Sequence, residues 1–181
     1  MKFIWKIGLV LAALGAAGCG KAPPAPAPSP PPASAESAPA AVDGARALEE
    51  VRNFVALGNR DAGTEGAKKA AEYLFDRLRT LGVEAEIQEF REASPQGETV
   101  FRNVLGRIPG GDGKIVLLGS HYDTKTGIAG FAGANDSGSS TGLLLELARA
   151  LKANAPQGAE IRFAFFDGEE CMARYGPQDG F

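Results

Sequence analysis

Apolar residues recur at helical spacing in two early segments of the chain. Between residues 45 and 55 they lie three and four positions apart, and a polar break follows at residues 58–61. Residues 67–81 repeat this spacing with alanines and leucines. Thr64 can cap the start of the second segment, and Gly82 suits the left-handed residue that ends a helix. The pattern predicts two helices.

Four further segments have the pattern of β-strands. Residues 83–87 alternate between apolar and polar positions, and residues 101–108 form a second candidate. Residues 115–118 form a continuous apolar run, which predicts a strand buried on both faces, as central parallel strands are. Residues 161–166 form a second run, apolar except for Arg162, and predict a further buried strand. Leucines on one side of residues 137–151 predict a helix between these two runs. The strand, helix, strand order is typical of a right-handed crossover in an α/β fold.

The pattern ends at Phe181 without a helix after the last predicted strand. A two-layer or three-layer α/β domain normally alternates until both faces of its sheet are covered. We therefore expect residues 44–181 to be the N-terminal part of a larger α/β domain.

The first 43 residues differ from the rest in composition. Lys2 and Lys6 precede an apolar run that is too short to span a bilayer, and small residues precede Cys19. This predicts an export signal over residues 1–19 with a bacterial lipobox, in which Cys19 is lipidated. The alternative is a soluble periplasmic protein cleaved nearby. Residues 20–43 are rich in Pro and Ala and predict an extended tether, so we expect a cell-envelope protein that contacts the membrane through its lipid anchor only.

Overall composition adds two constraints. The chain of 181 residues is 44% hydrophobic with a net charge of −3, which fits a globular domain and gives no indication of a nucleic-acid partner. Besides Cys19, the only cysteine is Cys171. Its acidic neighbours disfavour a reactive thiolate, so we interpret Cys171 as a small buried residue rather than a nucleophile.

Candidate metal ligands follow the two predicted buried strands, at residues 115–118 and 161–166. His121, the only histidine, follows the run that starts at residue 115, and Glu169 and Glu170 follow the run at residues 161–166. In an open, mostly parallel sheet the carboxyl ends of the strands form the crevice where ligands bind, so these side chains could meet. Carboxylates and neutral imidazole suit zinc, whereas adjacent carboxylates without a cation would be costly to bury.

Two aspartates extend this candidate site. Asp123 lies two positions after His121 and can accept the imidazole N–H, which would fix the tautomer; a structural histidine is the alternative. Asp136 precedes the predicted helix at residues 137–151, so it could cap that helix or serve as a further metal ligand. Of Glu169 and Glu170, one could bind the metal while the other moves protons, unless the pair is simply an exposed acidic loop.

Residues 138–142 match the G-x-S-x-G string of a serine-hydrolase nucleophile elbow. Such an elbow needs a strand directly before it and a partner histidine later in the chain. This segment lies at the start of a predicted helix and no histidine follows it, so we exclude that class.

Four segments, in this order, resemble the family of zinc-dependent aminopeptidases and glutaminyl cyclases over residues 45–181. They are residues 58–64, 119–125, 133–138 and 166–170. The resemblance implies a zinc-exopeptidase-like fold, that is, an α/β three-layer sandwich with a mixed, mostly parallel central sheet. It also implies a cis peptide bond after Asp136.

The resemblance assigns roles to the candidate residues. It implies that Asp136 and Glu170 bind zinc and that Glu169 is the general acid and base; we place Asp123 with Glu169 among the catalytic residues. His121 would bind a second zinc in the aminopeptidase branch and would not be a ligand in the cyclase branch. A further histidine ligand beyond the glutamates is also implied, and the chain does not contain one.

Residues 121–125 and 175–181 favour the cyclase branch. We therefore predict a glutaminyl-peptide cyclotransferase with one Zn²⁺ that converts the N-terminal glutamine of a peptide or protein to pyroglutamate. The alternative is an aminopeptidase with two Zn²⁺ ions that hydrolyses the first peptide bond. A second alternative is a binding domain that has this fold without the chemistry.

Overall fold

The computed structural model describes residues 40–154, 158–176 and 179. In chain order the elements are α1 (Gly44–Val55), α2 (Glu65–Thr80), β1 (Glu84–Ser94), β2 (Gly97–Ile108), β3 (Ile115–His121), the π-helical turn η1 (Ala134–Ser139), α3 (Ser140–Ala153) and β4 (Glu160–Phe166). The predicted export signal (1–19) and most of the predicted tether (20–43) lie outside the described residues. No helix in the described part of the chain has the length and hydropathy that a membrane span requires.

The predicted helices are confirmed, with the expected residues at their ends. The Thr64 hydroxyl accepts the N–H of Ala67 at 3.3 Å at the start of α2, and Gly82 after α2 has φ +76°. The helix expected from Ser137 differs, because Asp136 and Ser137 have non-helical backbone angles. Regular α-helix therefore begins only at Ser140, after η1.

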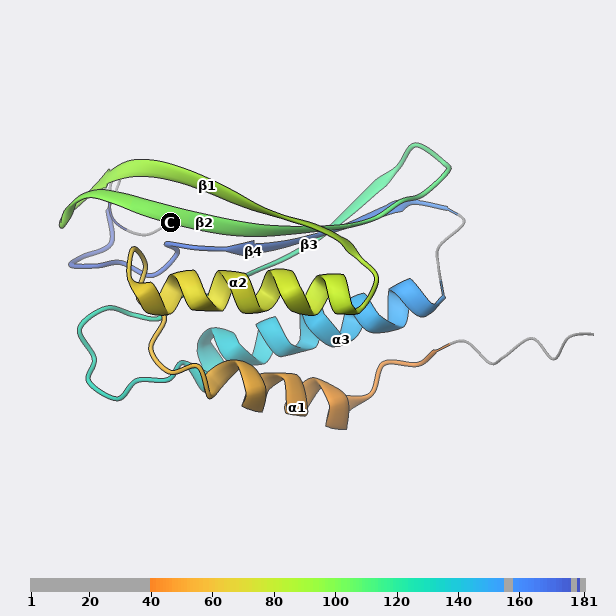
Figure 1. The fold of residues 1–181 in the computed structure, drawn as a ribbon, viewed down its shortest axis with the longest axis horizontal. Helices are drawn as coiled ribbons and strands as arrows, with labels where there is room; N and C mark the ends of the chain where they lie inside the picture. The colour runs from red at the N-terminus through yellow and green to blue at the C-terminus, as the bar shows by residue number, and fades with distance from the viewer. Residues whose placement is uncertain (1–39, 155–157, 177–178, 180–181) are drawn as a thin grey trace, which may run out of the picture. The chain divides into compact units, whose positions relative to one another are not determined.

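A four-stranded sheet has the order β1-β2-β4-β3 (Figure 1). β3 and β4 are parallel, as the strand, helix, strand pattern predicted. β1 pairs antiparallel with β2, and β2 pairs antiparallel with β4. The sheet is therefore mixed, but the expected predominance of parallel pairing does not hold among the described strands. The cause is a long β1–β2 hairpin, closed by a turn at Pro95 and Gln96, whose polar strands extend well beyond the predicted segments.

α2 and α3 pack on one face of the sheet, and α1 packs against α3 on the side away from the sheet (Figure 1). The core between these helices and the sheet consists of fully or nearly fully buried side chains: Leu74, Leu78, Val104, Leu145, Phe163 and Phe165. No described helix covers the opposite face. The third layer implied by the resemblance is therefore not seen in residues 40–154 and 158–176.

β3 differs from its prediction. Ile115 and Leu117 are 53% and 60% exposed, although the continuous apolar run predicted burial on both faces. β3 lies at the edge of the described sheet. Leu118 packs against the core, and neighbouring side chains of a strand point to opposite faces, so Leu117 belongs to the face that no described helix covers. An apolar run indicates that a strand is hydrophobic, but it does not indicate which segments pack against that strand.

Residues 40–43, the end of the predicted tether, are bound to α3. Ala40 exchanges two hydrogen bonds with the Asn154 side chain, at 2.7 and 2.9 Å. The backbone N–H of Asp43 donates to the buried carboxylate of Glu146 at 2.8 Å. Residues 40–43 are thus joined to the folded domain by hydrogen bonds.

Candidate active site

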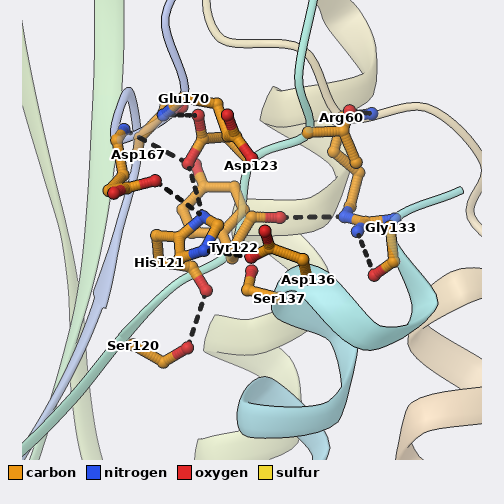
Figure 2. Close-up of polar contacts among 12 residues, drawn as sticks. Arg60, Ser120, His121, Tyr122, Asp123, Gly133, Asp136, Ser137, Asp167 and Glu170 are labelled. Atoms are coloured by element: carbon orange, nitrogen blue, oxygen red, sulfur yellow. Dashed lines mark hydrogen bonds and ion pairs between the residues drawn. The ribbon is translucent and has the colours of Figure 1, made fainter. Parts of the chain in front are cut away.

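Three segments meet at the carboxyl ends of β3 and β4 (Figure 2). His121 ends β3 and pairs in register with Phe166 at the end of β4, so both strands deliver their following residues to the same edge of the sheet. η1 brings Asp136 to this edge before α3 crosses the sheet. The topology therefore accounts for the predicted convergence of the histidine, the aspartates and the glutamate pair.

The imidazole of His121 lies between carboxylates. Nε2 is 2.9 Å from Asp136 Oδ1, while Nδ1 is 3.4 Å from Asp123 Oδ1 and 3.7 Å from Glu169 Oε2. Nδ1 has no hydrogen-bond partner among the described residues. Burial alone would lower the pKa of His121, but the Asp123, Glu169 and Asp136 carboxylates outweigh it and raise the pKa to about 9. The imidazole thus occupies a strongly anionic environment.

Asp123 fixes the backbone that carries the glutamate pair. The residue is fully buried; its Oδ1 accepts the N–H of Glu169 at 3.3 Å and its Oδ2 accepts the N–H of Glu170 at 3.0 Å. The carboxylate lies 3.4 Å from His121 Nδ1, as expected, but the predicted hydrogen bond from the imidazole is not formed. Asp123 therefore connects the end of β3 to the segment after β4.

The two glutamate side chains diverge, as the strand-end geometry predicted. Glu170 is buried and accepts a hydrogen bond from the Tyr175 hydroxyl at 2.6 Å. The Glu169 side chain is 40% exposed and faces His121. Burial raises the pKa of Glu169, His121 lowers it, and the neighbouring Glu170 carboxylate raises it further, with a net upward shift. The alternative of a simple exposed acidic loop does not describe this pair.

Asp136 does not cap a helix in the described structure. Neither η1 nor α3 has a side-chain capping hydrogen bond, and the Asp136 carboxylate contacts the imidazole of His121 instead. The Asp136–Ser137 peptide bond is cis, as the resemblance implies. With 64% of its side chain exposed, the carboxylate is available to a ligand.

The donor chemistry of this cluster fits zinc. Three carboxylates, those of Asp123, Asp136 and Glu169, surround one imidazole, and Glu170 is joined to them through Asp123. Within the described residues no Lys or Arg side chain forms an ion pair with any of these four carboxylates. A divalent cation would neutralise this excess negative charge, and oxygen and imidazole donors are ligands of zinc. No three His, Cys, Asp or Glu side chains in residues 40–154, 158–176 and 179 are arranged to enclose an ion. The described side chains therefore have the donor types of a zinc site without the arrangement of a complete one.

A hollow of about 330 Å³ adjoins the cluster. Its lining includes the rings of Phe90 and Phe166, the Asn103 side chain, and both His121 and Glu169. This is the size range of pockets that hold small ligands. It leaves room for an amino-acid side chain next to the Glu169 carboxylate.

Two residues of the site were missed by the sequence patterns. Tyr175 lies in a segment that was noted only for its resemblance, and its hydroxyl holds Glu170. Arg60 is fully buried beside the cluster, where its guanidinium binds backbone carbonyls (Figure 2). Arg60 also lies in a segment that was noted only for its resemblance, and no spacing indicated its contacts, because backbone carbonyls belong to every residue type.

Similar sequences belong to enzymes. Residues 103–176 match the sequence model of peptidase family M28. The chain is 34% identical over 131 residues to a glutaminyl-peptide cyclotransferase-like protein from Bos taurus, covering 66% of this chain and 34% of that protein. It is 32% identical over 127 residues to a glutaminyl-peptide cyclotransferase from Drosophila melanogaster, covering 66% and 36%. The chain thus spans about a third of the length of these relatives.

Similar solved structures agree with this result. A glutaminyl cyclase from an Acidobacteriales bacterium superposes with a TM-score of 0.73 at 34% identity, covering 82% of this chain and 52% of that chain. A Zn-dependent exopeptidase from Parabacteroides distasonis superposes with a TM-score of 0.65 at 30% identity, covering 75% and 52%. Sequence and fold therefore indicate the same relationship.

Proposed function

Because this chain belongs to the family of zinc-dependent aminopeptidases and glutaminyl cyclases, we propose that it is a glutaminyl-peptide cyclotransferase. Its substrate would be a peptide or protein with an N-terminal glutamine, and its products pyroglutamate and ammonia. One observation carries this proposal. Asp123 accepts the backbone N–H groups of both Glu169 and Glu170, and on the opposite side of the site His121 contacts Asp136.

We assign Asp136 and Glu170 as zinc ligands. His121 contacts Asp136 through Nε2 at 2.9 Å, which suits a residue that orients a ligand from outside the coordination sphere. Tyr175 contacts Glu170 in the same manner. This arrangement supports one zinc ion. Bound zinc would supply Lewis acidity toward the side-chain carbonyl of the substrate glutamine.

Glu169 is our candidate for proton transfer. In cyclisation the α-amino nitrogen attacks the side-chain amide carbon, a C–N bond forms, and the bond to the departing nitrogen breaks. The attacking nitrogen loses one proton and the departing nitrogen gains one, so a single carboxylate between them can relay it. Glu169 faces the hollow beside Phe90 and Phe166, and burial raises the pKa of its carboxyl group above the ordinary value, in the direction that makes it a better base.

The aminopeptidase alternative uses the same residues and is supported by the match to peptidase family M28. Here His121 would be a ligand of a second zinc ion. Glu169 would take a proton from the attacking water and return it to the new amino group of the shortened peptide. The hydrolysis would release a free N-terminal amino acid rather than ammonia.

Metal analysis and product analysis of the full-length protein test these proposals together. A peptide with N-terminal glutamine should release ammonia while the rest of its sequence stays intact, and the purified protein should hold one zinc per chain. Two zinc ions and free glutamine would support the aminopeptidase instead. Zinc-loaded protein without turnover of any N-terminal residue would support a binding domain.

Two further expectations belong with this proposal. We propose a complete three-layer sandwich, supported by the sheet face that no described helix covers. We also propose export and lipid anchoring to the bacterial cell envelope, supported by the sequence of residues 1–19. Cys19→Ser should move the protein from the membrane fraction to the soluble fraction, whereas unchanged fractionation would contradict the anchor.

A further inference from the structure

Arg60 is a buried cation without a carboxylate partner in the described part of the chain. Its residue is fully buried, and the guanidinium carbon lies 4.5 Å from the centre of the Phe54 ring of α1. Burial lowers the pKa of Arg60 to about 10, although the nearby Asp123 and Asp61 carboxylates oppose the shift. A buried charge of this kind is tolerated only when its donors are satisfied.

Backbone carbonyls from separate segments satisfy those donors (Figure 2). Nε donates to the Tyr122 carbonyl at 2.9 Å, and Nη1 donates to the Ala132 carbonyl at 3.0 Å and to the Gly58 carbonyl at 2.9 Å. Nη2 donates to the Gly133 carbonyl at 3.4 Å. Tyr122 lies between His121 and Asp123, and residues 132–133 begin the loop to Asp136. One planar group therefore links both segments of the candidate site.

The backbone around Arg60 strengthens this link. The N–H of Arg60 donates to the Thr124 hydroxyl at 2.8 Å, and the N–H of Thr124 donates to the Arg60 carbonyl at 3.4 Å. Gly133 has a left-handed φ of +55°, and a Cβ at this position would lie 2.9 Å from Arg60 Nη2. A glycine at residue 133 thus permits both the loop conformation and the close approach of the guanidinium.

We propose that Arg60 is a positioning residue, which holds the Asp136 loop at a fixed place relative to the His121–Asp123 strand end. This inference rests on the proposed function, because it concerns the same zinc site. The contacts require arginine: its planar fork presents five N–H donors in fixed directions, whereas a lysine ammonium presents three at one point. Without the fork, the loop would lose its connection to Tyr122, and Asp136 would lose its place opposite His121.

The zinc affinity of Arg60→Lys in the full-length protein tests the proposal. We expect zinc to bind about 10- to 100-fold more weakly, the range found when groups that orient metal ligands are removed. Arg77→Lys is the matched control, because Arg77 joins α2 to Glu50 of α1 and lies on elements that carry no candidate ligand. Wild-type affinity in Arg60→Lys, or equal losses in both variants, would overturn the assignment.

Hydrogen–deuterium exchange of the zinc-free protein gives a second measurement. In Arg60→Lys, exchange should rise in residues 121–125 and 132–138 while α2 and β1 keep their wild-type protection. No rise, or a rise throughout the chain, would overturn the positioning role and leave Arg60 a residue of the fold alone. If wild-type protein binds no zinc, the proposed function fails, and this exchange pattern still decides the role of Arg60.

Discussion

Asp123 and Asp136 both contact His121, but their surroundings differ. Asp123 is fully buried and accepts two backbone N–H groups, whereas the Asp136 side chain is 64% exposed and contacts only the imidazole among the described residues. When a buried acceptor is removed, its donors lose their hydrogen bonds, which lowers the free energy of unfolding. When an exposed acceptor is removed, water takes its place. The two residues should therefore respond differently to the same chemical change.

We expect Asp123→Asn to lower the free energy of unfolding by about 1–3 kcal/mol, because the amide group offers one oxygen to two N–H donors. Asp136→Asn is the matched control and should change stability by less than about 0.5 kcal/mol. Urea unfolding of both variants in a zinc chelator checks this difference. Equal losses of stability in the two variants would contradict a stabilising role for the hydrogen bonds that Asp123 accepts from Glu169 and Glu170.

Glu169→Gln and Glu170→Gln separate proton transfer from metal binding. We expect Glu169→Gln to keep its zinc and lose about 10²- to 10⁴-fold in turnover, because the amide cannot relay a proton. Glu170→Gln should lose zinc, because it replaces an anionic ligand. Metal content and turnover are measured on the same samples, and normal turnover in Glu169→Gln would refute its role.

Sequence patterns located the acidic cluster but not the residues that support it. The predicted convergence is confirmed by the contacts of His121 with Asp123, Asp136 and Glu169. This convergence was predictable because the sequence shows both where strands end and which residue types follow them. Three of the four carbonyl contacts of Arg60 are with residues more than 60 positions away, so they depend on the completed fold. The assigned roles of the cluster residues stay predictions.

Close packing of α1 on α3 depends on Gly142. A Cβ at residue 142 would lie 2.8 Å from the backbone nitrogen of Val51 and 2.9 Å from the Ala47 carbonyl oxygen. These are backbone atoms of α1, which cannot move without displacing that helix. The absence of a side chain at Gly142 therefore sets the separation of the two helices.

We expect Gly142→Ala to lower the free energy of unfolding by about 1–3 kcal/mol through overpacking, even though alanine is the better helix former. Gly44→Ala is the control, because a Cβ at the start of α1 would meet no atom within 4 Å. It should be neutral or slightly stabilising. Thermal unfolding compares the two variants, and a stabilised Gly142→Ala would show that α1 shifts freely.

Elements were predictable where their periodicity is local. Apolar spacing predicts α1, α2 and the helix after residue 137, and the mostly apolar run at residues 161–166 predicts β4. The long hairpin was underestimated because the outer half of β1 has few apolar residues and little burial. The exposure of β3 could not be predicted, since it depends on which segments pack against the strand rather than on the strand itself.

The stability of the whole domain should depend on the ionisation of Asp167 after β4. This residue is 6% exposed; its Oδ2 accepts the N–H of Arg102 at 2.9 Å, while Oδ1 has no partner among the described residues. Burial raises the pKa of Asp167 to about 7, despite the opposing hydrogen bond from Arg102. Because an unfolded aspartate titrates near pH ~4, the folded state binds more protons between pH ~4 and 7.

Stability contributed by this carboxyl group therefore falls as pH rises from about 4 to about 7. We expect Asp167→Asn to remove that slope, so that the variant gains about 2–3 kcal/mol relative to wild type between pH 5 and pH 8. Unfolding in urea with zinc chelated measures the difference at each pH. Asp76→Asn, at an exposed position on α2, should show no such trend. A constant difference for Asp167→Asn would contradict the burial effect.

The backbone of Ala40 forms two hydrogen bonds with the Asn154 side chain, at the end of α3 remote from the candidate site. The helix has 14 residues, so about 21 Å of its length separates this attachment from Ser140 beside the catalytic cluster. The described chain therefore begins at the opposite end of α3 from the candidate site, and residues 40–43 leave the carboxyl ends of β3 and β4 open to a ligand.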